Sequence, residues 1–208
     1  MGTYQPAEEL HQLKKTVQPS WVRVTHWLNA LAVVIMILSG WRIYDASPVF
    51  HGFRIPTNLT LGGWLGGALQ WHFAAMWLLF FNGVFYLVMN LASDRIRSRF
   101  FPLSPRTVLR DLREALKGRL SHADPSMYNA VQKFAYLFAV LDITVLVLSG
   151  LAIWKSVQFA LLRDLFGGYD FARIVHFTAM ALICGFIVVH VTMVVLVPRS
   201  LLTMIRGR

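Results

Sequence analysis

The chain has 208 residues, of which 56% are hydrophobic and only 14% are charged, and its mean hydropathy is +0.54. An ordinary soluble domain is less apolar and richer in charge, so this composition excludes that class and indicates a membrane protein. The net charge of +10 comes from basic residues that flank apolar segments without any nucleic-acid-binding motif, so nucleic acid is not an expected partner.

Four apolar stretches are long enough to cross the roughly 30 Å hydrocarbon core of a bilayer, which takes about 20 helical residues. In chain order they cover residues 24–44, 66–91, 130–153 and 173–197. Each is expected to be a helix, because an isolated strand in lipid would leave its backbone groups without hydrogen-bond partners. The sequence therefore predicts an all-α, integral membrane four-helix bundle that forms a single domain over residues 1–208.

Basic residues are shared unevenly between the two ends of this bundle. The N-terminal arm, the 92–129 connection with Lys133, and the C-terminal tail hold 15 of the 20 Lys and Arg residues. Cytoplasmic loops are enriched in these residues, so we expect both termini in the cytoplasm and the positive charge against anionic lipid headgroups. Within the 92–129 connection, PRTVLRDLREALKGRL predicts an amphipathic helix on that membrane face. The polar residues 1–20 do not resemble a cleavable signal peptide.

An internal repeat relates the two halves of the chain. The similar segments are ILSGWRIY at 37–44 with VLSGLAIW at 147–154, and HFAAMWL at 72–78 with HFTAMAL at 176–182. Two helical hairpins of related design would produce this pattern. In the same alignment Tyr86 is opposite His190 and Tyr136 is opposite His26, so each half keeps one histidine of its own.

Four histidines lie within the predicted spans or at their ends. His176 and His190 are fourteen residues apart, which is about 3.9 helical turns and roughly 21 Å, so they lie on nearly the same helix face. Because successive spans cross the membrane in opposite directions, His72 is expected near the outer membrane surface with His176. His26 is expected near the inner surface with His190. Facing imidazoles in a helical bundle suit the two axial positions of a b-type haem iron. For any single histidine, a hydrogen bond to a neighbouring helix is the alternative.

Several motifs together carry a resemblance to a known family. They are VTHWLNA with His26, WHFAAMW with His72, YNAVQK at 128–133, and the His176–His190 pair with its spacing. On these motifs, residues 20–198 resemble the di-haem cytochrome b subunits of the prokaryotic cytochrome b561-type superfamily. Those subunits are the membrane anchors of nickel–iron hydrogenases, formate dehydrogenases and thiosulfate reductase-type molybdenum enzymes.

The resemblance implies an electron-transfer protein in the bacterial cytoplasmic (inner) membrane. It implies two haem b groups, with His72 and His176 on the outer iron and His26 and His190 on the inner iron. The haems would connect a periplasmic iron–sulfur, haem or molybdenum redox subunit with the quinone pool. Whether the chain has enzymatic activity of its own is left open, as is a homo-oligomer.

A quinone site is implied near the inner haem. By resemblance it borders the YNAVQK segment, with Asn129 and Gln132 as candidates for hydrogen bonds to the quinone oxygens. The alternative is that this polar patch is only a helix start at the headgroups, with Asn129 near the cap.

Anionic haem propionates would need donors near each membrane surface. Arg42 and Arg54 are the candidates at the outer side, and Arg23 and Lys133 are the candidates at the inner side. Basic residues also occur at membrane interfaces where no haem is bound. The long connection at 45–67 is expected to cap the outer haem and to offer a docking surface for a periplasmic partner.

Small and charged residues inside the spans have two interpretations each. Gly40, Gly83, Gly150 and Gly185, one per span, would allow close approach of either a macrocycle or a neighbouring helix. Asp142 is the one acidic residue inside a span, and we favour a hydrogen bond to a neighbouring helix. The alternative role is to orient a ligand imidazole or to tune a haem potential.

Two other functions stay open at this stage. One is a stand-alone superoxide:quinone oxidoreductase of the cytochrome b561 type, which a basic surface beside the outer haem would favour. The other is a haem-free membrane protein, such as a small transporter or an assembly factor, whose histidines are structural. An absorption spectrum distinguishes this haem-free protein from both redox functions, because only these two require the bands of a reduced b-type haem.

Overall fold

The computed structural model describes residues 18–93, 106, 110, 113 and 130–207. Four of its helices are long and apolar enough to cross a membrane: α2 (Ser20–Ala46), α3 (Leu65–Ala92), α6 (Ala130–Trp154) and α8 (Tyr169–Leu196). Three short helices accompany them: η1 (Thr57–Leu59), α7 (Ala160–Leu165) and α9 (Pro198–Arg206). The predicted all-α membrane bundle is confirmed, although α2 and α8 each begin about one turn earlier than expected. The predicted amphipathic helix in 92–129 lies largely outside the described residues.

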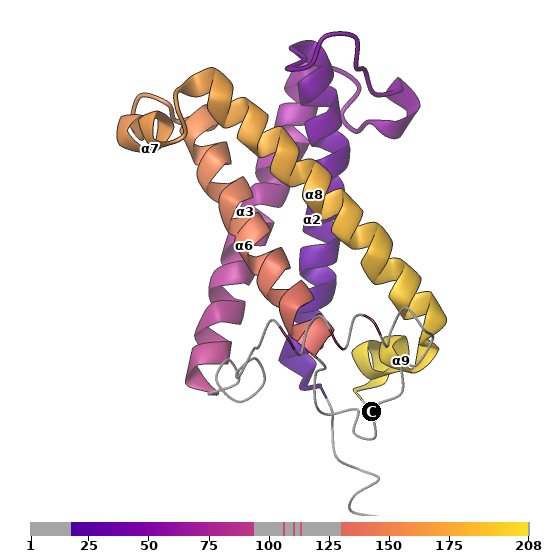
Figure 1. Ribbon diagram of the computed structural model, residues 1–208. Helices are drawn as coiled ribbons and strands as arrows, with labels where there is room; N and C mark the ends of the chain where they lie inside the picture. The colour runs from indigo at the N-terminus through magenta and orange to yellow at the C-terminus, as the bar shows by residue number, and fades with distance from the viewer. Residues whose placement is uncertain (1–17, 94–105, 107–109, 111–112, 114–129, 208) are drawn as a thin grey trace, which may run out of the picture.

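The bundle consists of two helical hairpins. The helix α2 packs along α3, and α6 packs along α8, whereas the two hairpins approach each other at few points along the backbone. Figure 1 shows the connections of both hairpins at one end of the bundle and the short helix α9 at the other end. This is the arrangement that the internal repeat predicts.

Small residues allow the helices of each hairpin to pack closely. The fully or nearly fully buried positions include Ala32, Ser39, Ala68, Ala75, Ser149, Ala152, Ala172 and Ala179. Lipid is as apolar as leucine, so helices in a membrane associate through close packing of small side chains rather than by burying large ones. Many large Leu, Val and Phe side chains are accordingly exposed on the surface of the bundle.

The connection between α2 and α3 folds back over the end of the bundle where both hairpin connections lie (Figure 1), which is the end predicted to face outward and is called the outer end below. Its Phe50 and Phe53, together with Tyr44, surround Phe177 of α8, and the ring centroids of Tyr44 and Phe177 are only 4.5 Å apart. Arg173 of α8 donates hydrogen bonds to the backbone carbonyl and to the hydroxyl of Ser47. Because Phe177 directly follows His176, this connection lies beside one of the predicted site residues.

A glycine turn leads from this connection into α3. Gly62 has a φ of 105°, and a Cβ atom at this position would lie 2.4 Å from the backbone nitrogen of Ala68. Both observations require glycine here. The turn therefore sets where α3 begins, two turns before His72.

Candidate functional site

The structure brings the four span histidines together as two pairs. His26 of α2 faces His190 of α8 with ring centroids 6.1 Å apart and ring planes at 58°. His72 of α3 faces His176 of α8 with centroids 6.5 Å apart and planes at 64°. Each pair joins one hairpin to the other, as the antiparallel threading predicts.

Both separations fit two imidazoles that share one metal ion. Two metal–nitrogen bonds of about 2 Å each, plus the radii of the two rings, place the ring centroids about 6 Å apart. Each pair offers two neutral nitrogen ligands on opposite sides, which is the donor set of a bis-histidine haem iron. The residues present therefore fit a b-type haem at each level.

Two serines contact the outer histidine pair. The Oγ atom of Ser39 on α2 lies 3.1 Å from Nδ1 of His72, and the Oγ atom of Ser149 on α6 lies 3.0 Å from Nδ1 of His176. In each hairpin, therefore, the serine on the first helix holds the histidine on the second. These serines are not among the site residues predicted from the sequence, although the repeated Leu-Ser-Gly at 38–40 and 148–150 is a signal that marks them.

Of the four span glycines, two lie directly against the outer histidines. A Cβ atom at Gly40 would lie 3.4 Å from Cε1 of His72, and one at Gly150 would lie 3.2 Å from Cε1 of His176. By contrast, Cβ atoms at Gly83 and Gly185 would meet nothing within 4 Å. The first two glycines thus make room for imidazole rings, whereas the other two border open space, where a flat macrocycle could come close to the helix.

The inner pair has different surroundings. His190 stacks on Phe186 with ring planes at 13° and centroids 5.7 Å apart, and His26 meets Trp27 edge-on. In the part of the chain that the structure describes, neither inner imidazole has a hydrogen-bond partner. Aromatic packing thus surrounds the inner pair, while serine hydroxyls contact the outer pair.

An amide network fastens α2 to α3 next to the inner pair. The side-chain amide of Asn82 donates to Oδ1 of Asn29 at 2.6 Å and to the backbone carbonyl of Thr25 at 2.8 Å. Asn82 is buried, and Thr25 directly precedes His26. These asparagines are not among the residues predicted from the sequence, since the sequence around an amide in an apolar span does not reveal its hydrogen-bond partner.

The family model described as prokaryotic cytochrome b561 matches residues 17–207. The chain belongs to the prokaryotic cytochrome b561 family. It is accordingly a haem b protein of electron transport and a multi-pass protein of the bacterial inner membrane. The resemblance predicted from the motifs is thereby confirmed for the family.

A relative from Azospira oryzae is 63% identical over 191 residues, which cover 92% of this chain and 96% of the relative. The relative is described as a putative protein-methionine-sulfoxide reductase subunit, YedZ1. The description of this relative names neither a hydrogenase nor a formate dehydrogenase, so a partner of that type stays a prediction.

In this cytochrome b561, the repeat also relates the inner histidines to a pair of tyrosines. Tyr136 of α6 donates a hydrogen bond to the hydroxyl of Tyr86 of α3 at 3.2 Å. These are the positions that the sequence alignment placed opposite His26 and His190. At the inner level, two contacts related by the repeat therefore join the hairpins, namely the histidine pair His26–His190 and the tyrosine pair Tyr136–Tyr86. Only the histidine pair has imidazoles that can ligate a metal ion.

The candidate propionate residues differ in what they contact. Arg23 donates to the backbone carbonyl of Ile205 in α9 at 2.7 Å, and its buried Nε has no hydrogen-bond partner among the described residues. Arg54 is exposed and donates to the backbone carbonyl of Asp45 at 2.5 Å. Arg42 and Lys133 are half-buried. Arg23 and Arg54 are therefore each held by a backbone carbonyl in this cytochrome b561.

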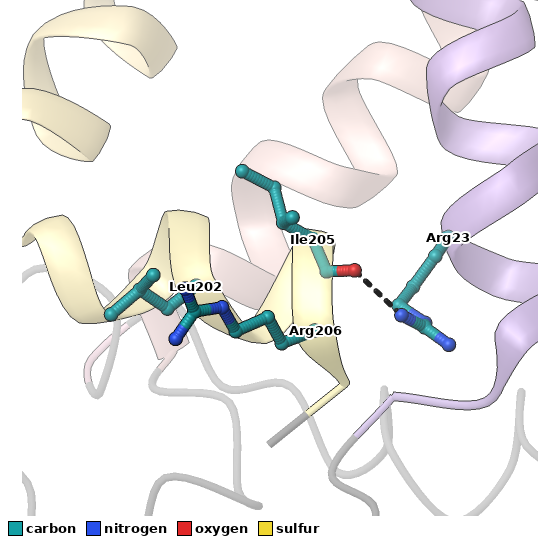
Figure 2. A pocket seen from close by; sticks show the side chains of 4 residues that line it. All are labelled: Arg23, Leu202, Ile205 and Arg206. Atoms are coloured by element: carbon teal, nitrogen blue, oxygen red, sulfur yellow. Dashed lines mark hydrogen bonds between the residues drawn. The ribbon is translucent and has the colours of Figure 1, made fainter.

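A cavity of about 710 Å³ opens beside Arg23 at the inner end of the bundle. Leu202, Ile205 and Arg206 of α9 form its other side, and Figure 2 shows the hydrogen bond from Arg23 to Ile205 along its edge. The helix α9 is also joined to α2 by the indole of Trp27, which donates to the carbonyl of Met204 at 3.4 Å. Arg23 and Trp27 lie on either side of His26 in the sequence.

The candidate quinone residues are only partly described. Asn129 lies outside the described residues, whereas Gln132 is exposed in the first turn of α6, one turn before Tyr136.

Asp142 is buried on α6, with 7% of its surface exposed. It lies two turns before Ser149 on the same helix face, and Ser149 contacts His176 of α8. Its Oδ2 atom has no hydrogen-bond partner within the described ranges, so the interhelical hydrogen bond expected from the sequence is not seen at this atom.

Proposed function

We propose that this cytochrome b561 is the membrane subunit that delivers electrons from the quinone pool to a periplasmic protein-methionine-sulfoxide reductase. The observation that carries the proposal is the presence of two facing histidine pairs, one toward each end of the bundle, at separations that fit an iron between them. The similarity to a putative subunit of such a reductase supports the choice of partner. Iron–sulfur, haem and molybdenum centres all stay open for that partner.

We assign two haem b groups to the two pairs. His26 and His190 hold the inner iron, and His72 and His176 hold the outer iron. When bound, the haems supply the one-electron redox chemistry. The chain supplies the ligands and excludes water, and it fixes the spacing through α8, on which His176 and His190 are roughly 21 Å apart.

The chemistry of the proposed partner sets the direction of electron flow. Reduction of methionine sulfoxide to methionine consumes two electrons and two protons and releases water. Oxidation of a quinol releases two electrons and two protons. Electrons therefore move from the inner pair to the outer pair and on to the partner, opposite to the flow in a hydrogenase.

The quinol is bound at the inner end, by residues at the start of α6. Asn129 and Gln132 are the candidate hydrogen-bonding residues, and the Tyr136–Tyr86 contact lies one helical turn deeper than Gln132. Both termini are cytoplasmic, in line with the bias of basic residues in the sequence, and the end of the bundle where α9 lies is then the cytoplasmic end (Figure 1).

The partner docks on the connection between α2 and α3. This segment exposes Phe50, Phe53, Leu59 and Trp64 at the outer end of the bundle. It also packs on Phe177, the residue after His176. A partner seated on this connection would therefore come close to the outer haem.

A haem assay and a reconstituted electron-transfer assay test the proposal. The purified chain should give two haem b per polypeptide in a pyridine haemochrome assay. In liposomes with a reduced quinone, it should support methionine sulfoxide reduction only when a periplasmic reductase from the same source is present. A colourless preparation contradicts the proposal. Rapid haem reduction by superoxide, with no transfer to any reductase, favours the superoxide oxidoreductase instead.

A further inference from the structure

We propose that Ser39 and Ser149 are positioning residues of the outer haem. They fix which nitrogen of each ligand imidazole carries the proton and lower the midpoint potential of this haem, whereas the inner histidines have no such hydrogen bond within the described residues. This role deepens the function proposed above, because it rests on ligation of the outer iron by His72 and His176.

The hydrogen bonds of each serine decide which ring nitrogen of its histidine carries the proton. Ser39 Oγ lies 2.6 Å from the backbone carbonyl of Ile35, and Ser149 Oγ lies 2.6 Å from that of Val145. A carbonyl can only accept, so the single hydroxyl proton of each serine goes to its own helix. The serine oxygen can therefore only accept a hydrogen bond from the imidazole.

The imidazole must then donate its Nδ1 proton to the serine. A neutral imidazole with its proton on Nδ1 presents the lone pair of Nε2. Both outer ligands are therefore held, before any metal binds, in the tautomer that coordinates iron through Nε2.

A hydrogen bond at Nδ1 also changes the ligand as an electron donor. A ligating histidine whose other nitrogen donates to an acceptor becomes more basic. A more basic ligand stabilises the ferric iron more than the ferrous iron, and this lowers the midpoint potential. Since both outer ligands have such a bond, the effect acts on the outer haem from both sides.

The packing around each serine leaves little room for another arrangement. Ser39 and Ser149 are both fully buried, with 0% of their surface exposed. The glycine that follows each serine brings the helix backbone against the same imidazole ring. In each helix, the serine hydroxyl and the backbone of the glycine that follows it therefore lie against the same imidazole ring.

The same arrangement occurs independently in both halves of the chain. The Oγ to Nδ1 distances are 3.1 and 3.0 Å, and both serines donate to the carbonyl four residues earlier. By contrast, the inner ligands have aromatic neighbours and no hydrogen-bond partner in the described ranges. The serine contact is therefore a property of the outer level rather than of span histidines in general.

Spectropotentiometric titration of the purified holoprotein tests this role. Wild type, Ser39→Ala, Ser149→Ala and the double variant are titrated while the haem absorbance is followed. The outer component is identified as the one that is missing in His72→Ala. We expect its midpoint potential to rise in each single variant and to rise further in the double variant, with the inner component unchanged.

A matched control is Thr178→Val. Thr178 is two residues from His176 and donates to the carbonyl of Ile174, but it is exposed and has no hydrogen bond to an imidazole among the described residues. Its substitution should shift neither potential. If an alanine variant loses the outer haem, Ser149→Cys supplies the measurement, because a thiol is a weaker acceptor and should cause a smaller rise of the same sign.

Two outcomes overturn the proposed role. One is an unchanged outer potential in variants that retain both haems, and the other is an equal shift of both components. A wild-type protein without haem would instead contradict the proposed function itself, so the two failures are distinguishable.

Discussion

His26 of α2 and His190 of α8 face each other across the two hairpins, with their ring centroids 6.1 Å apart. The first belongs to the N-terminal half of the chain and the second to its C-terminal half. An iron held between them would tie together two hairpins whose backbones make few other contacts with each other. The same reasoning applies to His72 and His176 near the outer end of the bundle.

Replacing His190 should remove only the inner haem. In His190→Ala we expect one haem b per chain instead of two, because the outer pair does not use this residue. Pyridine haemochrome analysis and the low-temperature absorption spectrum measure this change. Thr192→Ala is the control, since Thr192 is exposed and donates only to its own helix. Retention of two haems in His190→Ala would contradict the assignment.

Gly150→Ala should weaken the outer site more than Gly40→Ala. The added Cβ would lie 3.2 Å from the ring of His176 in the first variant and 3.4 Å from that of His72 in the second. Overpacking of this kind costs about 1–3 kcal/mol, and we expect most of this cost at Gly150. Thermal unfolding followed by Soret absorbance measures the difference, and equal Tm values for the two variants would count against it.

Asp142→Leu should stabilise the protein. The carboxylate oxygen Oδ2 is buried without a described hydrogen-bond partner, and an unsatisfied buried polar group costs about 1–3 kcal/mol. A higher unfolding temperature is therefore expected. The midpoint potentials of the same variant test whether Asp142 tunes a haem potential. Unchanged potentials of both haems would contradict that role.

Loss of the Arg23 side chain should release α9. Its hydrogen bond to the carbonyl of Ile205 is charge-assisted and short at 2.7 Å, but it is exposed. It therefore contributes less than the roughly 1.5–3 kcal/mol of a hydrogen bond to a charged group. In Arg23→Ala, hydrogen exchange in Pro198–Arg206 should become faster. Trp27→Phe, which removes a longer bond of 3.4 Å to the same helix, should have a smaller effect. Unchanged exchange in both variants would show that other contacts hold α9.

The sequence alone was sufficient to predict the four spans and the depth of each histidine. A bilayer requires about 20 apolar residues per helix, and the rise of 1.5 Å per residue converts the spacing of His176 and His190 into two levels. Antiparallel threading then paired His72 with His176 and His26 with His190. No information about side-chain contacts was needed for these steps.

The contacts that distinguish the two levels were decided by the tertiary structure. The repeat marked Leu-Ser-Gly in both halves, but the face that Ser39 or Ser149 turns toward a neighbour depends on the rotation and crossing angle of packed helices. The same is true of the glycines, since Gly40 and Gly150 lie against imidazole rings whereas Gly83 and Gly185 border open space. Spacing along one helix fixes depth and face, and only packing between helices fixes which side chain each face meets.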